Sequence, residues 1–179
     1  MFKNKNINIG IIYRNYKDRK REKELLKIAK ACKKNRYKLY VSNDIKLAHK
    51  VKADGIYIPS FNKTKKFLNI EKRNLVILGS AHNQKEIRTK ILQNCEIIFL
   101  SPMFNIKKTK TFLGIYKFNY LSIFNKANIF PLGGFSNKNI KKLKLLKAQG
   151  FGGMSIFKKK TGLKEAGFNK EKFLLNFKL

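Results

Sequence analysis

Small polar and basic residues follow two apolar runs near the middle of the chain. The runs are residues 75–78 and 97–100, each short enough to be a buried strand. Hydroxyl, imidazole and ammonium groups are suited to binding anionic groups and moving protons. In proteins that alternate strands and helices, the carboxyl ends of the strands carry the chemistry. The candidates at these two ends are Ser80, His82, Ser101, Thr109 and Lys110.

The segment between the two runs indicates how they are arranged. Ile87, Ile91 and Leu92 recur at helical spacing among charged residues, which predicts a helix between two strands. Strand, loop, helix and strand in this order form the parallel β-α-β unit. We expect the rest of the chain to be organised around this unit.

The remaining sequence continues the alternation of strands and helices. Apolar runs predict seven strands, at residues 8–13, 37–42, 55–58, 75–78, 97–100, 128–132 and 153–157. Helical spacing predicts further helices at residues 18–35, 44–51, 64–68, 118–124, 136–150 and 170–177. Alternation predicts a parallel sheet, and glycine pairs at the ends of late strands indicate an α/β fold of the TIM (β/α) barrel type.

Length and composition fit a globular protein with a real core. The chain has 179 residues, of which 43% are hydrophobic. No apolar run approaches the ~20 residues of a membrane span, and residues 1–6 lack the apolar region of a signal peptide. We therefore expect a cytoplasmic protein with one domain over residues 1–179.

Cysteine and histidine usage argues against a metal cluster. Cys32 and Cys95 form neither a close pair nor a metal-binding spacing, and His49 and His82 are the only histidines. In a chain without an export signal, we interpret both cysteines as reduced core residues.

The charge is strongly unbalanced. Lys and Arg total 42 against 10 Asp and Glu, a formal net charge of +32. Such a field attracts nucleic acids, acidic surfaces or phosphate-bearing substrates. The excess is mostly Lys, spread along the chain with many Asn and Ile, which favours a compositional origin. The sequence has no recognisable nucleic-acid-binding motif and no basic stripe with interleaved aromatics, so we expect no specific nucleic-acid partner.

Four short motifs follow the predicted strands in order. They are Asn43-Asp44 with Ala53-Asp54-Gly55, Gly79-Ser80-Ala81-His82-Asn83 with Glu86, Ser101-Pro102-Met103-Phe104 with Lys110, and Leu132-Gly133-Gly134-Phe135 with Asn139. Each motif alone is weak. Together, in this order and spacing, they resemble the thiamine-phosphate synthase/TenI family, which has a TIM-barrel fold. The resemblance runs from about Ile9 to Phe157.

The resemblance implies a transferase of thiamine biosynthesis. Such a synthase joins hydroxymethylpyrimidine diphosphate to a thiazole phosphate. Diphosphate leaves, a pyrimidine carbocation-like species forms, and the thiazole nitrogen captures it. This chemistry needs cations around the leaving diphosphate, Mg²⁺ held by carboxylates, and backbone N–H groups for the thiazole phosphate. The implied partners are small phosphorylated substrates.

The resemblance also assigns roles to the residues that bind diphosphate and metal. Arg14 and Lys110 would hold the diphosphate. Asn43 would bind the diphosphate, and Asp44 would bind Mg²⁺ beside it. Thr109, directly before Lys110, belongs to the same substrate-binding loop.

The other carried-over residues would act at the reacting centre and at the second phosphate. Ser80 and His82 would sit beside the pyrimidine and diphosphate and, with Lys110, form the catalytic group. Gly133 and Gly134 would let backbone N–H groups approach the thiazole phosphate, helped by a helix that Ser136 caps.

Several positions depart from the family pattern. The family's Gln-Leu-Arg-Glu-Lys is residues 12–16 here, without the Gln and the Lys. Its Gly-Gln-x-Asp is residues 59–62, so Asn62 stands where a second Mg²⁺ carboxylate would be. The family's first strand has no counterpart before Asn8. The barrel is therefore expected to have seven strands, or a gap between the strands at Ile9 and Gly153.

These departures leave three alternatives to a working synthase. The first is a phosphate-binding family member without catalysis, which the lost carboxylate and strand would explain. The second is the related thiazole tautomerase, although that branch has a histidine where Pro102 stands. The third is a nucleic-acid-binding protein, which only the net charge supports.

Overall fold

Strands and helices alternate along the chain in the computed structural model, which describes residues 8–16, 21–67, 74–106, 109, 111–125, 127–153 and the backbone of 172–177. The strands are β1 (Asn8–Tyr13), β2 (Lys38–Ser42), β3 (Gly55–Ile58), β4 (Val76–Ala81), β5 (Ile97–Leu100), β6 (Asn128–Pro131), β7 (Gly150–Gly153) and β8 (Lys172–Phe177). The helices are α1 (Arg21–Lys34), α2 (Ile45–Lys50), α3 (Gln84–Leu92), α4 (Gly114–Ile123) and the 3₁₀ helix η2 (Ile140–Leu145).

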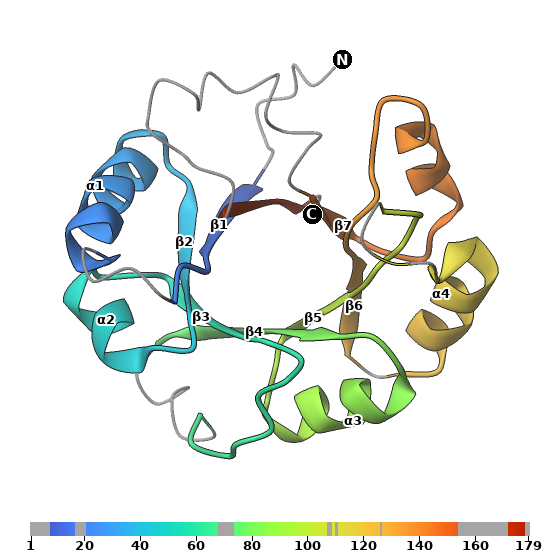
Figure 1. Cartoon of the computed structure of the whole chain (residues 1–179), viewed down its shortest axis with the longest axis horizontal. Helices are drawn as coiled ribbons and strands as arrows, with labels where there is room; N and C mark the ends of the chain where they lie inside the picture. The colour runs from blue at the N-terminus through green and yellow to red at the C-terminus, as the bar shows by residue number, and fades with distance from the viewer. Residues whose placement is uncertain are drawn as a thin grey trace.

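The strands form a closed ring with the helices outside it (Figure 1). From β1 to β6, each strand pairs in parallel with the next one along the chain. A parallel bridge from Leu132 to Gly152 connects the end of β6 with β7. The prediction of a parallel α/β barrel is confirmed. Parallel strands also bring their carboxyl ends to one rim of the ring.

The place between β7 and β1 is taken by β8, which runs antiparallel to both neighbours. The prediction of a gap there was therefore wrong, and so was the helix predicted for residues 170–177 over its described part, residues 172–177. A short apolar run cannot be assigned to helix or strand from its periodicity alone. The segment forms a strand here because the edges of β1 and β7 would otherwise leave N–H and C=O groups unpaired.

Alternation along the strands separates two cores. One cluster lies between the sheet and the helices and includes Ile11, Tyr13, Val41, Ile56 and Ile58. The other fills the lumen of the ring and comes from the alternate positions. The lumen cluster is Ile12, Tyr40, Tyr57, Leu78, Phe99, Phe130 and Leu132.

The helices bury one side against the outer face of the sheet. In α1, Leu25, Ile28 and Cys32 are buried at helical spacing. Cys32 and Cys95 are both buried, as predicted. Within the described residues, no helix combines the length and the apolar character needed to cross a bilayer.

Three local predictions differ from the structure. Residues 65–67 form a bend and a turn and residue 64 has no regular structure, so the helix predicted for 64–68 is not formed there, and residue 68 lies outside the described residues. The strand predicted for 153–157 lies earlier, at Gly150–Gly153, and residues 154–157 lie outside the described residues. The helix expected after Ser136 is the six-residue 3₁₀ helix η2, whose first residue is Ile140.

Replacing Leu175 by proline tests the closing strand. Leu175 is in register with Gly10 of β1 and with Gly152 of β7. Proline lacks the N–H of an interior strand, so Leu175→Pro should lower the free energy of unfolding by about 2–3 kcal/mol. Urea titration measures the change, and Leu175→Ala, which keeps the N–H, is the control. Equal stability of the two variants would contradict the pairing of β8.

Candidate functional site

The predicted site residues lie at the rim formed by the carboxyl ends of the parallel strands. Arg14 follows β1, Asn43 and Asp44 follow β2, and Ser80 lies one residue before the end of β4. The other residues that the structure describes follow at the same rim after β4, β5 and β6. They are His82, Thr109, Gly133 and Gly134. Lys110 lies outside the described residues.

Arg14 and Ser80 meet through a residue that the sequence did not single out. The guanidinium carbon of Arg14 lies over the ring of Tyr57, 5.6 Å from its centroid, and the Ser80 side chain lies close enough to the Tyr57 hydroxyl to influence its pKa. Burial raises the pKa of Tyr57 above 10, although the charge of Arg14 and the Ser80 side chain act in the opposite direction. Tyr57 therefore stays a neutral phenol and joins the residues from β1 and β4 across the lumen.

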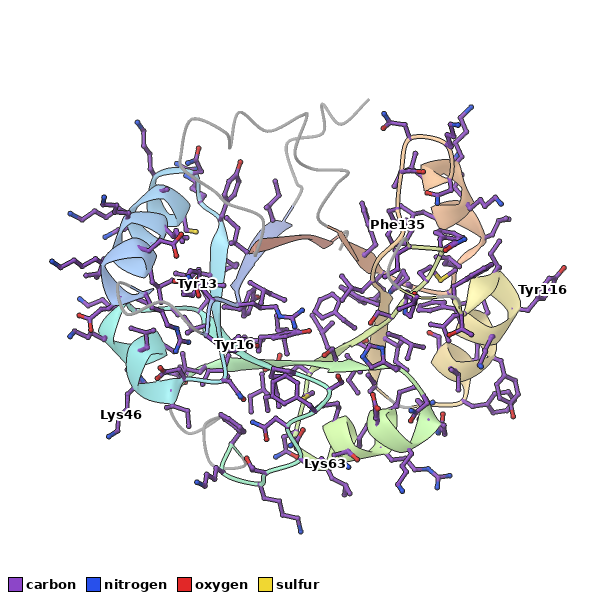
Figure 2. All side chains as sticks on the ribbon, viewed as in Figure 1. Tyr13, Tyr16, Lys46, Lys63, Tyr116 and Phe135 are labelled. Atoms are coloured by element: carbon purple, nitrogen blue, oxygen red, sulfur yellow. The ribbon has the colours of Figure 1, made fainter. Side chains whose placement is uncertain are left out.

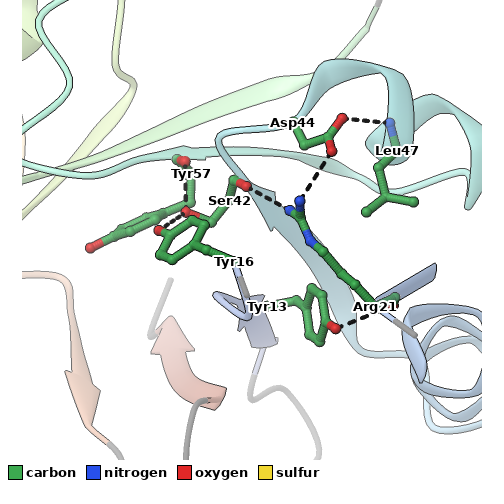
Figure 3. Close-up of polar contacts among 7 residues, drawn as sticks. All are labelled: Tyr13, Tyr16, Arg21, Ser42, Asp44, Leu47 and Tyr57. Carbon is green, nitrogen blue, oxygen red and sulfur yellow. Dashed lines mark hydrogen bonds and ion pairs between the residues drawn. The ribbon is translucent and has the colours of Figure 1, made fainter. Parts of the chain in front are cut away.

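A second group of contacts surrounds Asp44. The N–H of Leu47 donates to Asp44 Oδ1 at 2.9 Å, so Asp44 caps α2 as predicted. The other carboxylate oxygen lies 3.2 Å from Arg21 Nη1. Arg21 also donates from Nη2 to the carbonyl oxygen of Ser42 at 3.1 Å (Figure 3). The guanidinium thus fixes the Asp44 carboxylate to the end of β2.

The loop after β1 reaches the same place. The Tyr16 hydroxyl lies 2.6 Å from Ser42 Oγ (Figure 3). The Tyr16 ring packs edge-on against Phe61, with 6.4 Å between the centroids. Ser42 is fully buried and its hydroxyl also donates to the carbonyl of Tyr57 at 3.3 Å. The ends of β1, β2 and β3 are therefore linked by side chains.

Asn43 is held by Asn62 from the next loop. The Asn62 amide nitrogen donates to Asn43 Oδ1 at 2.5 Å. Asn43 adopts a positive φ of 61°, which asparagine tolerates better than most residues. Its backbone N–H donates to the carbonyl of Tyr57 at 3.0 Å. The backbone turn and the amide bond together set where the Asn43 side chain can meet a ligand.

His82 is oriented by the end of β5. Its Nδ1 lies 2.7 Å from the carbonyl oxygen of Ser101, and a carbonyl can only accept. The proton is therefore on Nδ1, and Nε2 is the acceptor of the neutral ring. The backbone N–H of His82 donates to Glu86 Oε2 at 2.8 Å, and Asn83 caps α3. These bonds fix an exposed imidazole at the rim.

The two glycines after β6 have different surroundings. Both have a positive φ, 89° at Gly133 and 77° at Gly134. A Cβ on Gly134 would lie 2.4 Å from the carbonyl oxygen of Phe104, whereas a Cβ on Gly133 would have its nearest neighbour at 3.8 Å. Gly134 is therefore required by packing, whereas a Cβ on Gly133 would make only ordinary van der Waals contact with Pro102.

The turn after these glycines is held by Asn139. Its amide nitrogen donates to the carbonyl of Gly134, and its Oδ1 accepts from the N–H of Ser136, both at 2.8 Å. Because Ser136 does not cap a regular α-helix here, the helix dipole contributes little to a phosphate site. Binding of phosphate at Gly133 and Gly134 stays a prediction that depends on backbone N–H groups.

The donor set at Asp44 allows only a partial metal site. Among the described residues, no three His, Cys, Asp or Glu side chains gather to hold a metal. Both Asp44 oxygens are engaged, and Asn62 replaces a second carboxylate. Mg²⁺ often binds one or two carboxylates and completes its shell with substrate phosphates and water. Asp44 fits that pattern once phosphate oxygens are present.

Some of these contacts could have been found from the sequence. Ser42 and Tyr57 occupy lumen positions of their strands, so alternation of inward and outward positions identifies them. Tyr16, Arg21 and Asn62 lie in loops or at a helix start, where no periodicity applies. Their contacts depend on the loop conformation, which a single sequence does not give.

The comparison with protein families decides the relationship. The family model described as thiamine monophosphate synthase matches residues 6–157. The chain belongs to this family. The match contains β1 to β7 and therefore all the parallel strands that carry the site.

Individual relatives agree with the family. A thiamine-phosphate synthase from Prochlorococcus marinus subsp. pastoris is 31% identical over 133 residues, 71% of this chain and 37% of the relative. The match thus spans little more than a third of that relative's length. A thiamine phosphate pyrophosphorylase from Pyrococcus furiosus has a TM-score of 0.65 at 16% identity, covering 81% of this chain and 70% of that structure.

A solved structure from outside natural enzymes has a similar fold. It is a cube-shaped, highly porous protein cage designed by fusing symmetric oligomeric domains, with a TM-score of 0.56 at 12% identity. The match covers 72% of this chain and 46% of that chain. At such low identities, the two structural matches support the barrel fold and nothing further.

The glycine pair offers a matched test of the local packing. Both positions have positive φ, so an added Cβ is strained at either one, and only Gly134 meets the Phe104 backbone. Gly134→Ala should therefore be less stable than Gly133→Ala by about 1–3 kcal/mol, the usual cost of overpacking. Denaturant unfolding of both variants measures the difference. Equal stabilities would show that the chain at Gly134 does not approach Phe104 as described.

Proposed function

We propose that this chain is a thiamine-phosphate synthase-type transferase, which joins hydroxymethylpyrimidine diphosphate to thiazole phosphate and releases diphosphate. One observation carries the proposal. The residues that resemble the family's site motifs are far apart in sequence, and those that the structure describes lie at one rim of a barrel of that family. Family membership supplies the reaction class, and the rim supplies the groups that such a reaction needs.

Arg14 and Asn43 bind the diphosphate in this proposal. Breaking the bond between the pyrimidine methylene carbon and the diphosphate oxygen leaves the electron pair on oxygen, so negative charge develops there. A fixed guanidinium and fixed N–H donors stabilise that charge most when they need no reorganisation. Arg14 is oriented by the Tyr57 ring and Asn43 by Asn62. The net charge of +32 attracts the anionic substrates to this rim.

Mg²⁺, when bound, would neutralise diphosphate charge and orient the leaving group. Asp44 would hold it together with diphosphate oxygens. Arg21 lies 3.2 Å from the same carboxylate, so the ion competes with a guanidinium at Asp44. Metal binding should therefore be weak without diphosphate and stronger with it.

Ser80 and His82 flank the place where the pyrimidine would react. Ser80 is buried beside Tyr57, while His82 is exposed and is held through Nδ1 at the carbonyl of Ser101. Ser80 orients the pyrimidine, and His82 lies beside the departing diphosphate. The thiazole nitrogen then forms the new C–N bond. The Gly133 N–H donates to the carbonyl of Gly152 at 3.4 Å, so the other N–H groups of the turn at Gly133 and Gly134 would hold the thiazole phosphate. Thr109 and Lys110 complete the diphosphate side from the loop after β5.

The direct test is product formation. The chain is incubated with both substrates and Mg²⁺, and thiamine phosphate is followed by fluorescence after oxidation. Arg14→Met should lower kcat/KM by about 100-fold, because it removes a cation from the leaving group. Lys46→Met is the matched control, since Lys46 is exposed on α2 and points away from the barrel (Figure 2).

The control separates a site role from an effect of net charge. Each variant removes one positive charge, so equal losses would mean that Arg14 acts only through the general field. Absence of thiamine phosphate with the parent chain, at enzyme concentrations equal to those of the substrates, would contradict the synthase proposal. Chelation of Mg²⁺ in the same assay tests whether the metal is needed.

A further inference from the structure

Lys90 is a fully buried lysine outside the site residues discussed so far. It lies on α3, and its exposed fraction is 0%. Its ammonium donates to the carbonyl oxygen of Pro59 at 2.8 Å, the carbonyl oxygen of Asn62 at 2.7 Å and Oε1 of Gln93 at 2.8 Å. The ion pairs of the described residues do not include Lys90. A buried ammonium with three neutral acceptors is costly, so its retention calls for a specific use.

The acceptors show what Lys90 holds. Pro59 and Asn62 belong to the loop that leaves the carboxyl end of β3. Gln93, the C-cap residue of α3, donates from Nε2 to the carbonyls of Asn62 at 3.1 Å and Thr64 at 2.8 Å. One side chain in α3 and one at its end thus bind three carbonyls of residues 59–64, which we call the β3 loop.

The sheet leaves room for the lysine stem. A Cβ on Gly79 would lie 2.9 Å from Lys90 Cδ and 2.7 Å from Cys95 Sγ. Gly79 of β4 therefore allows the alkyl chain to run between helix and sheet to the β3 loop. The route from α3 to the loop depends on glycine at this position.

The β3 loop bears directly on the substrate site. Asn62 donates to Asn43, and Phe61 packs against Tyr16, which bonds to Ser42. We infer that Lys90, braced by Gln93, is a positioning residue that fixes the β3 loop so that Asn62 holds Asn43 ready for the diphosphate. The identity of the ligand in this inference rests on the proposed function. The placement of the β3 loop rests only on the hydrogen bonds of Lys90 and Gln93.

The charge of Lys90 gives the inference a thermodynamic signature. Burial lowers the pKa of Lys90 to about 8, although the charge of Glu86 on α3 acts in the opposite direction. Cys95 is a neutral thiol, because burial raises its pKa to about 12, and Lys63 on the β3 loop is exposed. Because the folded-state pKa lies below the ordinary 10.5, the protonated lysine lowers the free energy of unfolding. This destabilisation is complete below pH 8 and decreases as the pH rises from 8 toward 10.5.

Lys90→Met separates positioning from stability. Methionine keeps the stem and removes the buried charge, so the variant should unfold at the same or a higher temperature than the parent at pH 7. It should nevertheless bind inorganic pyrophosphate roughly tenfold more weakly in calorimetry, because one hydrogen-bonding arrangement at Asn43 is lost. Lys85→Met is the matched control on the exposed side of α3 and should change pyrophosphate binding little.

Hydrogen exchange supplies a measurement that needs no ligand. In Lys90→Met, the amides of residues 60–64 should exchange faster than in the parent and in Lys85→Met. Any gain in unfolding temperature should shrink as the pH rises from 8 toward 10.5. If Lys90→Met lost stability and pyrophosphate affinity together, Lys90 would have only a structural role and the inference would be overturned. Unchanged hydrogen exchange in the β3 loop of this variant would overturn it as well. A parent chain that binds pyrophosphate but forms no product would refute the synthase proposal alone.

Discussion

Closure of the barrel is the constraint on which the rest of the structure depends. Parallel strands at the ends of an open sheet leave a row of N–H and C=O groups unpaired. Here β8 pairs with β7 and β1 at once, in the antiparallel sense, and the ring closes. Because β1 to β6 are parallel within this ring, their carboxyl ends and the residues that follow them face one rim. The candidate site lies at that rim.

Within the ring, alternate residues of each strand point into the lumen or toward the helices. Aromatic residues such as Phe99 and Phe130 fill the lumen, with their rings edge to face. Above them, Tyr57 presents its ring to Arg14 and its hydroxyl to Ser80. This buried layer under the rim gives Arg14 a fixed neighbour in the Tyr57 ring.

Sequence patterns predicted the parallel strands well because burial on both faces leaves clear apolar runs. The bounds of β1, β3 and β5 agree with the predicted runs, and Asp44 caps its helix as expected. The segment at β8 was misassigned because its pairing depends on edges formed by distant strands. Asn62 stood out in the sequence only as a missing carboxylate, because its bond to Asn43 depends on loop geometry. Lys90 did not stand out, because a buried charge within a lysine-rich chain leaves no local signal. Whether Arg14, Ser80 and His82 carry out the proposed reaction stays a prediction.

Amide hydrogen exchange along β1, resolved residue by residue by NMR, tests closure most directly. Successive N–H groups of a strand point alternately to its two neighbours, here β2 and β8. If β8 closes the barrel, the amides of residues 9–13 should all be protected from exchange. The exchange rates of the amides that face β8 should lie within about tenfold of the rates of those that face β2, because both sets lie in a closed sheet. Slow exchange at alternate residues only, with the others near the rate of unprotected amides, would show an open edge and contradict the closed barrel.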